Sequence, residues 1–181
     1  TNRKRIGQTD CIKRKLFTKI RKQEKIKIKF WFLNDVIWVK TDALPNLNGR
    51  RFTNNHETLI WSVKNKDCKK YTFNYEFMKK LNGGKQMKDT DWVFSLCKGK
   101  ERLKDENGIK AHPTQKPLKL IQQVVLAASS KGDIIFDPFM GSGTTAIVAE
   151  ALGRKWLGVE RDEKYVALAR NRVKSYATQT K

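Results

Sequence analysis

Apolar residues recur in short blocks along the second half of the chain, and their spacing predicts a regular order of helices and strands. The block LKLIQQVVLAAS at 118–129 places apolar residues three and four apart, as in an amphipathic helix. It is followed by strand 133–136, helix 143–152, strand 156–160 and helix 162–175, with Gly132 and Gly153 in the turns before the two strands. This alternation predicts an α/β fold with a doubly wound parallel sheet.

The first half of the chain has a different pattern. DVIWVK at 35–40 and ETLIWSVK at 57–64 are rich in Val, Ile and Trp, which predicts two strands. Pro45 and the pair Asn48-Gly49 lie between them and indicate a long polar loop. Residues 65–111 are polar, basic and interrupted by glycines, so we expect an irregular insertion with one helix near 74–81.

These patterns divide the chain into four segments. Residues 1–30 have neither a helical nor an alternating period, and we interpret them as a basic arm or a leader foreign to the fold. The other three segments are a strand pair at 31–64, the insertion at 65–111 and a β-α-β-α part at 112–181.

The charge of the chain favours a polyanionic partner. The formal net charge is +21, of which residues 1–30 contribute +10 and residues 31–181 contribute +11. A lysine-rich overall composition is the alternative explanation, but the folded part is strongly basic without the arm. Such an excess of Lys and Arg binds nucleic acid by releasing counterions, so double-stranded DNA is the expected partner.

The numbers of cysteines and histidines indicate the cellular compartment and bear on whether the chain binds a metal ion. Cys11, Cys68 and Cys97 are scattered and odd in number, which indicates a reducing, cytoplasmic compartment and no disulfide framework. His56 and His112 are the only histidines, so we expect no metal site. No apolar run approaches the length of a bilayer span, and we expect no membrane association.

The sequence FDPFMGSGTT, at 136–145, contains a Gly-x-Gly turn between a predicted strand and a predicted helix. A turn of this kind usually brings the backbone close to a ligand. A P-loop is excluded because no lysine follows Gly143. The dinucleotide pattern fits through Gly141, Gly143 and Ala146, with Glu160 as a ribose partner. S-adenosylmethionine requires nearly the same geometry but carries an ammonium and a sulfonium instead of a pyrophosphate. Asp137 suits these cations and would repel a pyrophosphate, so it favours S-adenosylmethionine, although a helix-capping or turn aspartate is the alternative.

HPTQKP at 112–117, together with DPFMGSGTT, resembles the permuted (beta-group) DNA amino-methyltransferases of restriction-modification systems, an N6-adenine/N4-cytosine family. The resemblance covers residues 34–175 and implies a Rossmann-like S-adenosylmethionine-dependent fold and a base rotated out of DNA. By this resemblance the methyl donor would be held by Asp137, Phe139, Gly141, Ser142, Gly143, Thr144, Glu160, Thr114 and Lys116. The residues that would flank the target base are His56, Glu57 and Thr58.

The insertion at 65–111 would be the target-recognition region. GKQMKDTDW at 84–92 looks most similar to members that methylate adenine N6, with cytosine N4 as the alternative. The candidate DNA contacts in this region are Tyr75, Lys85, Lys88 and Trp92.

The family's catalytic tetrapeptide, Asp/Ser/Asn-Pro-Pro-aromatic, does not occur in this sequence. We therefore expect the C-terminal part of a methyltransferase, from a truncated gene or a split enzyme, that is inactive alone. A complementary N-terminal polypeptide or a second subunit would complete it. A non-catalytic DNA-binding protein is an alternative, and a nicotinamide-dependent oxidoreductase is disfavoured by HPTQKP and by the charge.

Overall fold

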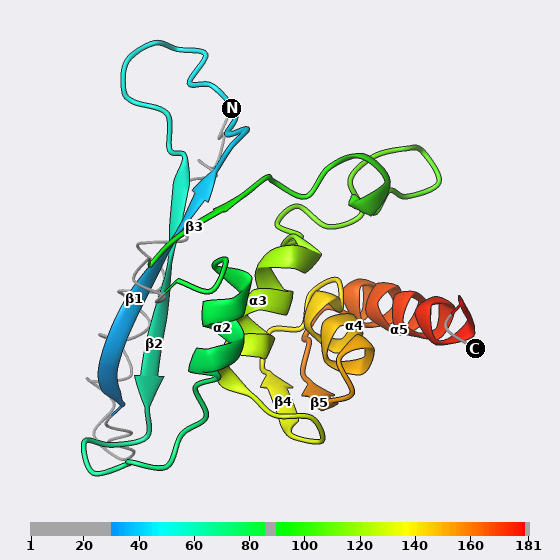
Figure 1. Ribbon diagram of the computed structural model, residues 1–181. Helices are drawn as coiled ribbons and strands as arrows, with labels where there is room; N and C mark the ends of the chain where they lie inside the picture. The colour runs from blue at the N-terminus through cyan, green and yellow to red at the C-terminus, as the bar shows by residue number, and fades with distance from the viewer. Residues whose placement is uncertain (1–29, 86–89, 180–181) are drawn as a thin grey trace, which may run out of the picture. The chain divides into compact units, whose positions relative to one another are not determined.

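The computed structural model describes residues 30–85 and 90–179 (Figure 1). The chain divides into two compact units. The first unit comprises Thr1–Leu33 and Ser62–Lys69, and in its described part the ammonium of Lys66 lies 5.4 Å from the ring centroid of Trp31. The second unit, Asn34–Trp61 with Lys70–Lys181, contains most of the helices and strands and every residue of the candidate site that follows.

Three strands form one sheet in the order β2-β1-β3. They are β1 (Trp31–Lys40), β2 (His56–Val63) and β3 (Asp91–Phe94). The arrows of β1 and β2 point in opposite directions in Figure 1, as expected for strands joined by a loop. β3 is parallel to β1, with Trp38 opposite Trp92, and the Trp38 indole N–H donates to the Phe94 carbonyl oxygen at 2.9 Å.

Two helices pack beside this sheet and complete its core. They are α2 (Tyr75–Leu81) and α3 (Leu118–Ala128), whose apolar residues face the two tryptophans. The buried side chains of this core are Trp38, Met78, Trp92, Leu120 and Ala127. Asn74 joins the helices, because its side-chain amide donates to the carbonyl oxygens of Leu126 and Ser129 at the end of α3.

The C-terminal part forms a second, two-stranded sheet. It contains β4 (Ile134–Asp137), α4 (Thr144–Ala151), β5 (Lys155–Gly158) and α5 (Glu163–Gln179). β4 and β5 are parallel, and α4 connects them. The short helix η1 (Gly99–Glu101) lies in the segment between β3 and α3. Met140 and Ala146 pack against Ala169 of α5, so the loop after β4 is held between two helices.

One face of the β4–β5 sheet is open. Side chains two apart on a strand share a face, and so do directly paired residues of neighbouring parallel strands. Ile134, Phe136 and Leu157 therefore lie on one face, and each of them is more than half exposed. An exposed apolar sheet face of this kind is typical of a surface that binds another element.

The structure confirms the predicted order of helices and strands at 35–40, 57–64, 74–81 and 118–175, with boundaries shifted by a few residues. One expectation was wrong. The insertion at 65–111 is not wholly irregular, because β3 belongs to the three-stranded sheet. Trp156 of β5 is partly exposed and donates its indole N–H to Glu150 at 2.9 Å. In the part of the chain that the structure describes, no helix could span a membrane.

Candidate functional site

The loop after β4, residues 137–143, is tied to the neighbouring strand by its backbone. The Met140 amide donates to the Val159 carbonyl oxygen at 2.9 Å, and the Gly143 amide donates back to the Met140 carbonyl oxygen at 3.0 Å. Gly141 and Gly143 have φ angles of 52° and 77°, in the left-handed region that favours glycine. We call residues 137–143 the glycine loop. Its last residue is the N-cap of α4.

Both glycines are also required by close neighbours. A Cβ atom on Gly141 would lie 2.9 Å from His112 Nε2, and one on Gly143 would lie 3.1 Å from the Cβ of Ala169. The first contact shows that HPTQKP, distant in sequence, touches the glycine loop. The glycine loop therefore has a second wall made by residues 112–117.

Asp137 organises the loop from within. One carboxylate oxygen accepts the Phe139 amide at 2.9 Å, and the other accepts the Thr145 hydroxyl at 2.6 Å. The bond to the Phe139 amide, two residues further along the chain, is the turn arrangement that the sequence left open as an alternative for Asp137. Contact between this carboxylate and a bound cation stays a prediction.

Glu160, just beyond β5, connects the loop to the second strand. Its Oε2 accepts the Gly141 amide at 2.8 Å, while Oε1 accepts the amides of Arg161 and Asp162 at 2.8 and 3.0 Å. These backbone donors, the Asp162 amide foremost, lower the pKa of Glu160 and keep the carboxylate ionised. A carboxylate has about four acceptor positions, so roughly one is left for a ligand hydroxyl.

The side chains of Ser142 and Thr144 point away from solvent. Both residues are buried, and the guanidinium of Arg172 donates to the Ser142 carbonyl oxygen at 3.1 Å and to the Thr144 hydroxyl at 3.0 Å. Arg172 was not singled out from the sequence, where it is one of many basic residues in α5. The structure shows it as the side chain that fixes the glycine loop to that helix.

No side-chain hydrogen bond caps the start of α4, because its N-cap residue, Gly143, has no side chain. The first amides of a helix carry partial positive charge and suit a carboxylate. Residues 141–144 are buried, whereas Phe139 of the same loop is largely exposed.

Residues 112–117 form a fixed turn against the loop. The His112 ring packs on Tyr165 of α5 with centroids 4.4 Å apart, and burial lowers the pKa of His112 although Glu160 nearby opposes this. Gln115 is buried, where it donates to the Glu101 carbonyl oxygen at 2.8 Å and accepts the Leu103 amide at 3.0 Å. Thr114 is exposed at the tip of the turn.

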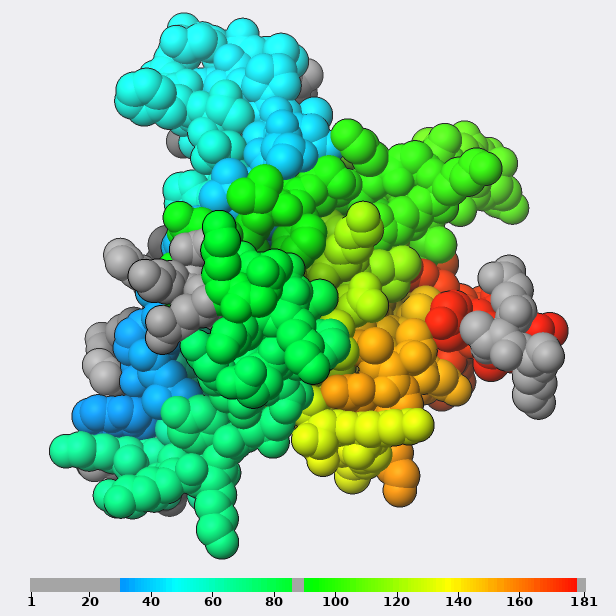
Figure 2. Space-filling model, in the orientation of Figure 1, coloured from blue at the N-terminus to red at the C-terminus, as the bar shows by residue number. Residues whose placement is uncertain are grey.

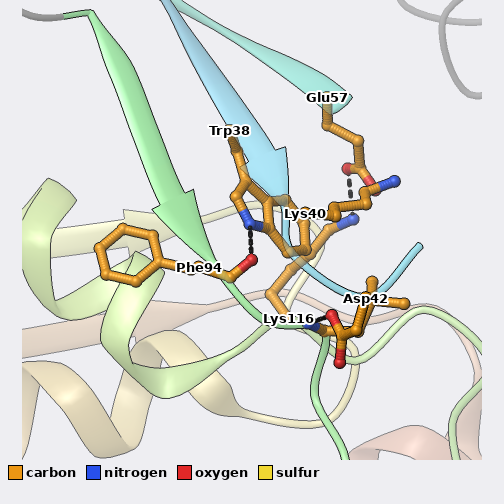
Figure 3. Close-up of polar contacts among 7 residues, drawn as sticks. Trp38, Lys40, Asp42, Glu57, Phe94 and Lys116 are labelled. Atoms are coloured by element: carbon orange, nitrogen blue, oxygen red, sulfur yellow. Dashed lines mark hydrogen bonds and ion pairs between the residues drawn. The ribbon is translucent and has the colours of Figure 1, made fainter. Parts of the chain in front are cut away.

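Lys116, the fifth residue of HPTQKP, forms an ion pair with an acid of β2 (Figure 3). Its ammonium lies 2.7 Å from Glu57 Oε2, and Lys40 pairs with Glu57 Oε1 at 3.1 Å. Both ammonium groups lie over the Trp38 ring, at 5.3 Å for Lys40 and 5.7 Å for Lys116. Burial opposes ionisation of Glu57, but the two lysines outweigh it and lower the pKa. This cluster joins β1, β2 and the turn.

The structure therefore brings most of the predicted site residues into two connected groups. The glycine loop, Glu160 and residues 112–115 meet at the end of the β4–β5 sheet. Lys116 meets Glu57 instead, while His56 is exposed and Thr58 half-buried on the same strand. The predicted contact between Lys116 and the methyl donor stays a prediction.

The predicted DNA contacts in the insertion require one correction. Trp92 is 9% exposed and lies in the core against Trp38, because β3 pairs with β1, so it cannot stack on DNA. Tyr75 is half-buried beside Phe73, and Lys85 is exposed. Lys88 lies outside the described residues.

Comparisons with known proteins all identify DNA methyltransferases as similar to this chain. The model of a DNA methylase family, the N6/N4 type, matches residues 6–171. The Type II methyltransferase M.HinfI of Haemophilus influenzae is 52% identical over 149 residues, which are 81% of this chain and 40% of that protein. M2.DpnII of Streptococcus pneumoniae is 44% identical over 146 residues, 81% of this chain and 52% of that protein. The chain thus spans about half the length of these relatives or less.

Among solved structures, the complex of M1.HpyAVI with S-adenosylmethionine superposes with a TM-score of 0.65 at 26% identity. It covers 90% of this chain, which corresponds to 70% of the other. The fold of the chain is accordingly a partial Rossmann-like α/β fold similar to that of DNA methyltransferases.

Proposed function

Because the chain belongs to the N6/N4 DNA methylase family, we propose that it provides the cofactor-binding and DNA-recognising part of a site-specific DNA methyltransferase of restriction-modification type. The cofactor is S-adenosylmethionine, which supplies an electrophilic methyl group. The DNA is double-stranded, as the net charge of +21 favours.

The observation that carries this proposal is the meeting of three sequence-distant groups at one sheet edge. The Gly141 amide is bonded to Glu160 at 2.8 Å, and His112 Nε2 lies 2.9 Å from the position of a Gly141 Cβ. Ligands of open α/β sheets bind at the carboxyl ends of the strands, which is where these residues lie.

The residues fit a zwitterionic amino acid joined to a sugar. The uncapped amides of α4 suit the carboxylate, and the ionised Glu160 accepts a ribose hydroxyl. Asp137 adds negative charge for the ammonium and sulfonium. Phe139 provides the apolar surface, while Ser142 and Thr144 contribute through their backbone, because their hydroxyls are turned toward Arg172.

Adenine N6 is the target atom in this proposal. It is supported by the resemblance of 84–92 to N6-adenine members, and residues 65–111 would read the sequence around the base. His56, Glu57 and Thr58 would lie beside the rotated base. Methylated DNA digested to nucleosides distinguishes N6-methyladenine from N4-methylcytosine.

The chain carries four prolines and no Pro-Pro pair, so the catalytic tetrapeptide has to come from outside these 181 residues. We place it on a preceding part of a longer polypeptide or on a second polypeptide. The open face of the β4–β5 sheet, with Ile134, Phe136 and Leu157, supports the addition of further structure.

Isothermal titration calorimetry with S-adenosylmethionine tests the proposal. Saturable binding is expected, and Glu160→Ala should weaken it by about 10-fold or more, since a charged hydrogen-bond acceptor is lost. Glu163→Ala, an exposed acid at the start of α5, is the matched control and should bind as the wild type. Thermal unfolding of both variants verifies that they are folded.

The same titration with NAD tests the alternative that the protein is a nicotinamide-dependent oxidoreductase. Binding of NAD without S-adenosylmethionine would replace the proposal with an oxidoreductase. DNA binding with no response to either compound would favour a non-catalytic DNA-binding protein.

A further inference from the structure

The loop between β1 and β2, residues 41–55, is ordered although it is long. The side-chain amide of Asn46 donates to the Arg51 carbonyl oxygen at 2.7 Å, and the Gly49 amide donates to the Asn46 carbonyl oxygen at 3.0 Å. At its base the Lys40 amide donates to the Asn55 carbonyl oxygen at 2.7 Å. The loop extends beyond the two strands (Figure 1, in cyan) and is therefore a shaped projection.

Three apolar side chains of this projection are exposed to water. Phe52 is 100% exposed, Leu47 is 91% exposed and Leu44 is 75% exposed. Figure 2 shows the loop standing clear of the helices. Scattered exposed apolar residues are ordinary, but a group of three on one ordered loop marks a binding surface.

The charge of the loop identifies the partner. Residues 43–55 contain Arg50 and Arg51 and no acidic residue. The nearest acids in sequence are already neutralised, Asp42 by Lys98 at 2.6 Å and Glu57 by two lysines. An exposed aromatic ring between a pair of arginines and a run of asparagines matches proteins that insert an apolar side chain between base pairs while cations hold the phosphates.

A series of side-chain contacts connects the base of the loop to the proposed cofactor site. Lys40 and Glu57 lie at its two ends, and Glu57 is held by Lys116. Lys116 belongs to the same turn as His112, which contacts the glycine loop at Gly141. Each of these residues lies within the second compact unit.

We propose that residues 41–55 are a DNA-inserting loop: Phe52 enters the base stack of duplex DNA beside the target base, and Arg50 and Arg51 pair with the flanking phosphates. This inference rests on the proposed function and adds to it a named contact surface outside the insertion at 65–111.

Fluorescence anisotropy with a 20-base-pair duplex, at several salt concentrations, tests the electrostatic part. Arg50→Ala/Arg51→Ala should reduce the slope of log K against log salt by about 1.8, the value for two phosphate contacts. The control is Arg170→Ala/Lys174→Ala, which removes two exposed cations of α5 and should change the slope less. An equal change in both double variants would overturn the phosphate contacts.

The insertion itself is tested with 2-aminopurine in the same duplex, because its fluorescence rises when neighbouring bases unstack. The wild type should raise this signal, and Phe52→Ala should abolish the rise and weaken affinity by about 10-fold, while leaving the salt slope unchanged. Phe52→Leu keeps an apolar wedge and should retain most of the signal. The proposal is wrong if Phe52→Ala and the wild type give the same signal.

These outcomes are separable from the proposed function. Calorimetric binding of S-adenosylmethionine together with unchanged DNA binding by the loop variants would remove this inference alone. If Phe52→Ala alters self-association in sedimentation velocity and leaves DNA binding intact, the loop is a protein contact and the inference is also wrong. Absence of cofactor binding would instead remove the function from which it starts.

Discussion

Gly141 and Gly108 have similar backbone conformations, with φ angles of 52° and 74°, but their surroundings differ. A Cβ on Gly108 would meet nothing within 4 Å, whereas one on Gly141 would meet His112 Nε2 at 2.9 Å. Gly108→Ala should therefore cost only the left-handed backbone penalty, about 1–2 kcal/mol. Gly141→Ala should lower the free energy of unfolding by more than this, and it should also weaken S-adenosylmethionine binding. Urea unfolding and calorimetry measure the two effects.

The double variant Gly141→Ala/His112→Ala sharpens this comparison. It removes the close contact and keeps the backbone strain, so its coupling energy isolates the contact between the two segments. Additive effects of the two substitutions would show that His112 does not press on Gly141.

His112 gives a prediction about pH. Its pKa is lowered from the ordinary 6.5 in the folded protein, chiefly by burial, so the unfolded chain takes up this proton at a higher pH than the folded chain does. Stability from this group is present above about pH 6.5 and decreases as the pH falls below it. The free energy of unfolding should thus fall more between pH 7.5 and pH 5 in the wild type than in His112→Asn. Equal losses in the two proteins would contradict the assignment.

The sequence predicted some side chains of the candidate site but not others. The two glycines were predictable because a tight turn between a strand and a helix requires them, and Glu160 because an acid at the end of the next strand belongs to the same pattern. Arg172 was not, since an arginine that reaches inward from an amphipathic helix has the same letter as one in solvent. Ser142 and Thr144 belong to the predicted motif, but the motif does not tell that their hydroxyls face Arg172.

The strand β3 shows the same limit for local structure. DWVF is only four residues long and lies among lysines and glycines, so its apolar pattern is too short to predict a strand. It is a strand because β1 offers a partner, and this pairing is non-local in sequence. The longer blocks, such as α3 and β1, were predictable because their own periodicity is sufficient.

Placement of Trp92 on β3 leads to a prediction about stability. Trp92→Ala should lower the free energy of unfolding by about 3–5 kcal/mol, the usual cost of removing a buried aromatic ring. Val93→Ala is the matched control on the same strand: Val93 is exposed, so a change of about 0.5 kcal/mol is expected. Urea unfolding followed by circular dichroism measures both. A loss of DNA affinity in Trp92→Ala without a loss of stability would restore the surface interpretation.

The chain has a proposed cofactor site and an open apolar face on the β4–β5 sheet, and its sequence contains no tetrapeptide to hold the amino group of a base. Purified alone, it should bind S-adenosylmethionine and DNA and transfer no methyl group. A filter assay with tritium-labelled S-adenosylmethionine and mixed-sequence duplex DNA measures this. Incorporation of label above that of a Glu160→Ala control would contradict the proposed need for a further segment.

The ion pair between Lys116 and Glu57 has a thermodynamic consequence. It connects the turn at residues 112–117, which contacts the glycine loop, with the base of the proposed DNA-inserting loop at residues 41–55. If bound S-adenosylmethionine raises the affinity for DNA by some factor through this connection, bound DNA must raise the affinity for S-adenosylmethionine by the same factor. This follows because the coupling between two binding equilibria is reciprocal. Glu57→Gln, which weakens the connection, should therefore reduce both factors by the same amount.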